Sequence, residues 1–174
     1  MRTIVEYKEL FSLMRVNGSS DKKAPHKAIL LLSVIDLIER GFITTPFVPL
    51  SDEISQTFNR LWKELVPSSY PFSRRISYPF FHLNSSPFWN PVKTDSYVGQ
   101  KEYSSLSTLK RDYSGAVIDD DLFRYLSDPT TASELKDFLK VLYLPRLEEN
   151  AATKDFNLPL IDLLAILTLI CSVA

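Results

Sequence analysis

Histidine, cysteine and glycine are scarce in this 174-residue chain, and each shortage excludes a class of chemistry. The single cysteine, Cys171, excludes an internal disulfide and any zinc site that needs several thiolates. The four glycines form neither a phosphate-binding glycine loop nor a Gly-x-Ser-x-Gly nucleophile elbow. The two histidines, His26 and His82, belong to no His-Asn-His pattern. We therefore expect no cofactor and no metal, name no catalytic residue, and leave open whether the chain is an enzyme.

A continuous apolar leader is also lacking. Polar residues are interleaved with apolar ones directly after Met1, which is not the pattern of a signal peptide. Together with the lone cysteine, this pattern favours a cytoplasmic protein. The longest apolar stretch, 158–174, has 17 residues and contains Pro159 and Asp162, so it is short and flawed for a membrane span. We expect no membrane contact.

The small net charge of −1 hides an uneven distribution along the chain. Residues 1–111 carry 15 Lys and Arg against 10 Asp and Glu, a net of +5, and the remainder carries 5 against 11, a net of −6. Such segregation allows one basic face to meet a polyanion even though the whole chain is nearly neutral.

Length and hydrophobic content predict one domain followed by a tail. A chain of 174 residues with 45% hydrophobic residues can bury one real core but is short for two. We place the domain at 1–145 and an apolar tail at 146–174. The tail could be a terminal helix, a dimer contact or the product of a truncated reading frame. An apolar segment of this length that stayed exposed would promote aggregation.

Apolar residues at helical spacing predict a mainly helical chain. Pro25 suits a first helical turn and Gly41 suits a helix end, and between them Ile29–Ile35 is apolar nearly all round, which predicts a helix at the centre of the core. Ser51 is a candidate N-cap for the third helix. The predicted helices cover 4–15, 28–40, 52–65, 106–111, 120–126 and 132–142.

The segment 70–103 differs in composition from the rest, since its 34 residues hold 9 of the 21 aromatic residues together with four prolines. Prolines at that density oppose long helices and central strands. We predict short strands near 76–83 and 88–93, and residues 42–45 also have strand-like composition. The predicted fold is mainly α with a small β-hairpin in an aromatic, loop-rich segment, an α+β fold in a single domain.

Basic residues crowd the start of the second predicted helix: Lys22, Lys23, His26 and Lys27. Cations are disfavoured at the positive end of a helix dipole, and an anion bound there would relieve the conflict. The alternative is a solvated basic loop. The acidic run 119–121 has the opposite character and is better explained by the start of a helix than by a metal site.

A second candidate surface combines paired arginines with aromatic residues. Arg74 and Arg75 suit phosphate oxygens or guanine edges, and Tyr78 and Pro79 add a rigid apolar surface next to them. The alternative is that the phenylalanines that follow are core residues. Lys110-Arg111 is a weaker candidate, because an exposed basic pair can be plain surface.

Three stretches resemble one family of bacterial restriction endonucleases. Ala24–Ile35 resembles its APHKP-(I/L)-LLL opening, Tyr78–Leu83 with the later Phe88-Trp89 resembles its second signature, and Ala116–Leu126 resembles its ID-x-DLF-x-LL helix. The chain is thereby similar to the sulfur-binding domain of McrA-like HNH endonucleases, which recognises phosphorothioate DNA, while residues 146–174 do not resemble the HNH nuclease that follows in that family.

The resemblance implies a function and its residues. It implies that His26 and Lys27 contact DNA, and that Tyr78 and Pro79 form the sulfur pocket with His82 near its third position. His82 departs from the family, in which a small residue stands there. The expected partner is double-stranded, phosphorothioate-modified DNA, in a restriction system that defends against phage, with a nuclease supplied on another chain. The alternatives are a helical protein-interaction module that uses the aromatic segment and the tail, and a nuclease with unrecognised metal ligands.

Overall fold

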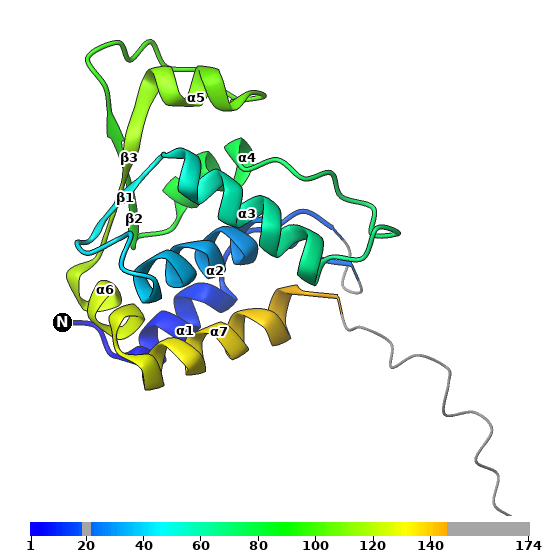
Figure 1. The fold of residues 1–174 in the computed structure, drawn as a ribbon, viewed down its shortest axis with the longest axis vertical. Helices are drawn as coiled ribbons and strands as arrows, with labels where there is room; N and C mark the ends of the chain where they lie inside the picture. The colour runs from blue at the N-terminus through cyan, green and yellow to red at the C-terminus, as the bar shows by residue number, and fades with distance from the viewer. Residues whose placement is uncertain (19–21, 146–174) are drawn as a thin grey trace, which may run out of the picture.

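The computed structural model describes residues 1–18 and 22–145, and the predicted tail 146–174 lies outside them. The mainly helical α+β fold expected from the sequence is confirmed (Figure 1). Among the described residues, no helix is long and apolar enough to cross a bilayer. The elements are α1 (Ile4–Ser12), α2 (His26–Glu39), β1 (Phe47–Pro49), α3 (Asp52–Leu65), α4 (Ser77–His82), the short 3-10 helix η1 (Leu83–Ser85), β2 (Trp89–Lys93), α5 (Leu106–Asp112), β3 (Tyr113–Ile118), α6 (Asp120–Ser127) and α7 (Pro129–Tyr143).

Helix α2 is the centre of the core, as its apolar sequence predicts. Figure 1 shows it between α3 and α7, and it also contacts α4 and α6. Its one fully buried hydroxyl, on Ser33, donates to the carbonyl of Ile29 at 2.6 Å, so this hydroxyl is satisfied within the helix. The helix ends before Gly41, whose φ of +74° is the left-handed conformation expected after a helix. This central position fixes where the N-terminus of α2 reaches the surface.

A three-stranded antiparallel sheet packs at one end of the helices, with β3 between β1 and β2. The prolines of the sheet, Pro49 and Pro91, lie on the two edge strands, where a missing N–H costs little. A side chain at Gly115 of β3 would place its Cβ 2.4 Å from the carbonyl oxygen of Val48. Glycine is therefore required for β1 to approach β3 this closely.

The strand predicted near 76–83 is wrong, because these residues form α4 and begin η1. Pro79 is tolerated there because it occupies the first turn of α4, where backbone N–H groups have no partner inside the helix. Ile76, Phe80 and Leu83 are buried at helical spacing. The strand predicted at 88–93 is confirmed as β2, but it pairs with β3 and forms no hairpin with 76–83.

Three further predictions have clear outcomes. The helix predicted at 52–65 has these bounds, although the Ser51 side chain makes no capping hydrogen bond. The strand-like segment 42–45 is not a strand, since the first strand begins after Pro46 and covers Phe47–Pro49. The acidic run does lie at the start of α6, with Asp119 at the N-cap position and Asp120 and Asp121 in the first turn. Asp119 also binds the Arg2 guanidinium and accepts from the Tyr7 hydroxyl at 2.9 Å. Among the described residues, no cluster of metal-binding side chains is present.

Candidate functional site

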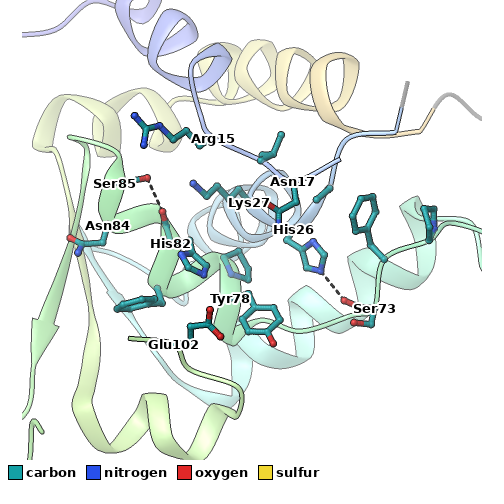
Figure 2. A pocket seen from close by; sticks show the side chains of 16 residues that line it. Arg15, Asn17, His26, Lys27, Ser73, Tyr78, His82, Asn84, Ser85 and Glu102 are labelled. Carbon is teal, nitrogen blue, oxygen red and sulfur yellow. Dashed lines mark hydrogen bonds between the residues drawn. The ribbon is translucent and has the colours of Figure 1, made fainter. Parts of the chain in front are cut away.

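A pocket of about 900 Å³ opens between the start of α2 and helix α4 (Figure 2). It is bordered by residues 15–17, which follow α1, by the segment 71–73, and by Glu102 in the loop before α5. Parts of both candidate surfaces of the sequence therefore meet in one place. The lining residues are Arg15, Val16, Asn17, Ala24, His26, Lys27, Pro71, Phe72, Ser73, Tyr78, Pro79, Phe81, His82, Asn84, Ser85 and Glu102.

Lys27, in the first turn of α2, is a buried cation without a partner among the described residues. Lys27 is 6% exposed, yet its ammonium group makes no hydrogen bond or ion pair with the described residues. Since no buried side-chain nitrogen of the described chain is both sealed and unbonded, the ammonium nitrogen must open to the pocket. Burial, and then the charge of Arg15, lower the pKa of Lys27 from 10.5. An anion in the pocket would remove this electrostatic penalty.

The helix terminus that carries Lys27 is itself uncapped. Pro25 stands at the N-cap position, and no side chain bonds to the free N–H groups of the first turn. These groups and the helix dipole favour an anion at the same end of the pocket. Arg15 adds a second cation, because its exposed side chain reaches the pocket from the segment after α1 and forms no ion pair with the described residues (Figure 2).

His26 is held as a neutral ring. Its Nε2 lies 2.8 Å from the carbonyl oxygen of Ser73, which can only accept, so Nε2 carries the proton and Nδ1 remains an acceptor. The ring also packs on Trp62, with 4.6 Å between centroids. Burial lowers the pKa of His26 from 6.5, and the bond to Ser73 opposes this only in part. The lowered pKa of His26 favours the uncharged ring at neutral pH.

Helix α4 supplies an apolar wall made of Tyr78, Pro79 and Phe81. The helix is anchored beneath this wall, because the indole N–H of the buried Trp89 donates to the Phe80 carbonyl at 3.1 Å. A rigid apolar surface thus faces the same space as the two unpaired cations.

The hydroxyl of Tyr78 is oriented from outside the pocket. Arg75 donates to it at 3.0 Å, and the guanidinium lies 5.5 Å from the centre of the same ring. His82 packs beside the wall, and the centroid of its ring lies 6.4 Å from that of Tyr78 and 5.3 Å from that of Phe81. The apolar wall therefore has charged and polar groups along its border.

The structure brings together five of the residues singled out in the sequence: His26, Lys27, Tyr78, Pro79 and His82. Arg75 joins them only through Tyr78. The others do not line the pocket. Lys22 and Arg74 are exposed, and the ammonium of Lys23 lies 5.4 Å from the centre of the Tyr143 ring. Lys110 pairs with Asp52 at 2.6 Å, and Arg111 pairs with Asp112 at 2.6 Å.

Sequence reasoning missed several residues of the pocket. Arg15 and Asn17 lie just before the basic loop and could have been read as part of the same basic segment. No sequence pattern singles out Asn84, Ser85 or Glu102. These positions depend on how distant segments meet, which local patterns do not encode.

Comparisons with known proteins give one informative result. No family model matches the chain, and no curated protein matches it. The structure aligns with a solved structure, "Sulfur binding domain of SprMcrA complexed with phosphorothioated DNA", at a TM-score of 0.61 and 14% sequence identity. The alignment covers 82% of this chain and 86% of that chain. The chain thus has a fold similar to that of a sulfur-binding domain, as its three sequence signatures suggest.

Proposed function

We propose that this domain binds double-stranded DNA through the pocket between α2 and α4 and recognises phosphorothioate sulfur in the backbone. The observation that supports the proposal is the apolar wall of Tyr78, Pro79 and Phe81 beside the unpartnered ammonium of Lys27. A cation alone would suit any phosphate, and an apolar wall alone would suit any hydrophobic group. Their combination suits an anion that carries one poorly hydrated atom.

A phosphorothioate is such an anion. Sulfur is larger, more polarisable and less strongly hydrated than the oxygen it replaces, so an apolar surface loses less free energy by desolvating it. Preference for the modified backbone then arises at Tyr78 and Pro79. His82 is more polar than an ideal neighbour for sulfur, and its exposed position leaves it at the border of the wall.

The rest of the binding free energy comes from charge. Lys27, Arg15 and the uncapped end of α2 would contact the negatively charged backbone, which makes affinity fall with salt. His26 is neutral and adds no charge, and its free Nδ1 acceptor could bind only an amino group of a base, because the DNA backbone offers no donor. Contacts with the backbone do not distinguish sulfur from oxygen, and they position the duplex on the pocket.

Two kinds of substitution separate these roles. Tyr78→Ala or Pro79→Ala should reduce the preference for phosphorothioate over ordinary DNA, whereas Lys27→Ala should weaken binding to both by a similar factor. The measurement is duplex affinity at several fixed salt concentrations. Phe42→Ala, which removes an exposed aromatic residue that does not line the pocket, is the control and should change neither quantity. If the chain shows no salt-dependent affinity for DNA, the result favours the alternative, in which the apolar surface binds a protein partner.

In this proposal the chain is the recognition part of a modification-dependent restriction system, and an HNH nuclease carried by another chain or segment cuts the DNA. The test is to incubate the purified chain with phosphorothioate DNA and Mg²⁺ or Mn²⁺. We expect binding without cleavage. Metal-dependent cleavage by this chain alone would contradict the division of labour.

A further inference from the structure

Glu102 is the one carboxylate among the described residues that line the pocket, and it stands among cations and neutral groups. Figure 2 shows it directed into the pocket from the side that carries Tyr78. Its carboxylate makes no ion pair or hydrogen bond with the described residues. On a surface meant for phosphates this charge is unfavourable, because it repels the backbone that Lys27 and Arg15 attract.

The chain on both sides of Glu102 is fixed by the buried carboxylate of Asp112. Asp112 accepts from the N–H of Gly99 at 3.1 Å, from the Tyr103 hydroxyl at 2.7 Å and from the Arg111 guanidinium at 2.6 Å. Gly99 and Tyr103 lie three residues before and one residue after Glu102. The backbone that presents Glu102 is therefore held in place rather than free to swing away from DNA.

The same segment is tied to the apolar wall. The ring of Tyr103, which is fully buried, packs on Phe81 of α4 at 4.8 Å between centroids. Helix α4 also carries Tyr78 and Pro79, so the backbone at Glu102 is held at a fixed distance from the proposed sulfur contact. A group in such a position can read one defined base pair next to the modified linkage.

The chemistry of DNA limits what an ionised carboxylate can contact, because it only accepts hydrogen bonds. Phosphates and sugars of DNA offer it no donor, whereas the base edges offer amino groups. In the major groove adenine presents its amino group beside the N7 acceptor, which would repel a carboxylate. Cytosine presents the N4 amino group with no acceptor on its own edge. Cytosine is thus the best match.

We propose that Glu102 selects a cytosine at one position near the phosphorothioate by accepting a hydrogen bond from its N4 amino group. This inference rests on the proposed function, since it requires DNA in the pocket. In this proposal the charge of Glu102 lowers the affinity for the DNA backbone and raises the preference for one base.

The test measures binding of the purified chain to phosphorothioate duplexes that carry each of the four base pairs in turn at each position near the sulfur. The wild type should prefer cytosine at one position by about tenfold. Glu102→Gln should move that preference to adenine, because a glutamine amide can pair with both N6 and N7. Glu102→Ala should abolish the preference and raise affinity for the other three sequences, since a repulsive charge is gone. Asp95→Asn, an exposed neighbour in the same loop that does not line the pocket, should behave as the wild type.

The outcomes separate this inference from the proposed function. If wild type and Glu102→Gln bind phosphorothioate DNA with the same base preferences, Glu102 does not read a base and only the inference fails. If the wild type binds no DNA, or binds sulfur and oxygen backbones equally, the proposed function fails as well. A change of preference in Asp95→Asn equal to that in Glu102→Gln would show a general charge effect and would also overturn the assignment.

Discussion

Two buried charges in this molecule are treated in opposite ways. Asp112 has no exposed surface and accepts hydrogen bonds from three donors on three different residues. Lys27 is almost as buried, yet it has no partner among the described residues. A buried charge that lacks partners destabilises a fold, so its presence needs an explanation.

The difference separates the charge that holds the fold from the charge that awaits a ligand. Asp112, the last residue of α5, fixes the loop before α5 to the end of that helix, and the interactions of its carboxylate are complete within the chain. The ammonium of Lys27 faces a pocket, and the neighbouring Arg15 makes its burial less favourable still. Residues that break a stability rule in this way are expected at functional sites.

The largest effect should follow the loss of Asp112. In Asp112→Ala the buried hydroxyl of Tyr103 and the N–H of Gly99 lose their acceptor, and Arg111 loses its counter-charge. We expect the Tm to fall by on the order of 10 °C and the 94–105 loop to become sensitive to protease. The measurement is thermal unfolding followed by circular dichroism. An unchanged Tm would mean that the hydrogen bonds of Asp112 do not support the fold.

Removing the charge of Lys27 should have the reverse effect on stability. Lys27→Met keeps the apolar stem but removes an ammonium group that burial of the residue partly desolvates, so we expect a Tm higher by about 2–4 °C together with DNA affinity lower by about tenfold. Lys140→Met, which removes an exposed lysine on α7, should leave both within error. A stabilised Lys27→Met variant that still binds DNA as tightly as the wild type would show that this charge is not reserved for DNA.

Alkaline pH should reproduce part of that result in the wild type. The pKa of Lys27 is lowered in the folded state, so the unfolded state binds more protons as the pH approaches 10.5 from below. The free energy of unfolding should therefore rise with pH in this window, while DNA affinity falls as the ammonium group is lost. Both slopes are compared with those of Lys27→Met, in which the contribution of Lys27 is absent while that of tyrosines with a raised pKa, such as Tyr7 and Tyr103, remains. Equal slopes in the two proteins would contradict a lowered pKa.

The smallest effect is expected at Lys110. Its ammonium already pairs with Asp52, both side chains are solvent-accessible, and neither residue lines the pocket. Lys110→Ala should change DNA affinity by less than about twofold and leave its salt dependence unaltered. A large loss of affinity would show that the binding surface includes α5. It would also contradict the idea that only cations without a partner in the described chain contribute to DNA binding.

The sequence predicts the parts of this fold that depend on local periodicity. The amphipathic pattern of 52–65 places α3 correctly, and the apolar run after Pro25 places α2 at the centre. The prediction fails at 76–83, where proline and aromatic residues suggested a strand although Ile76, Phe80 and Leu83 have helical spacing. Strand β3 was not predicted, because it exists through pairing with two distant strands.

The site shows the same division. His26, Lys27, Tyr78 and Pro79 were singled out by their residue types and their family signatures, and they meet in one pocket. Glu102 could not be found in this way, because only the contacts of Asp112 and Tyr103 bring its loop to α4. Arg15 likewise reaches Lys27 across a turn that local patterns do not specify.

The most direct test of the account compares the affinities of the wild-type chain for two duplexes of one sequence, one with a single phosphorothioate linkage and one without, at the same salt concentration. Each backbone position and both sulfur stereoisomers should be tried, since an apolar wall on one side of the pocket can contact only one of them. The account predicts that one modified duplex binds more tightly than its unmodified counterpart and that both affinities fall with salt. Equal affinity for every modified and unmodified pair would contradict it.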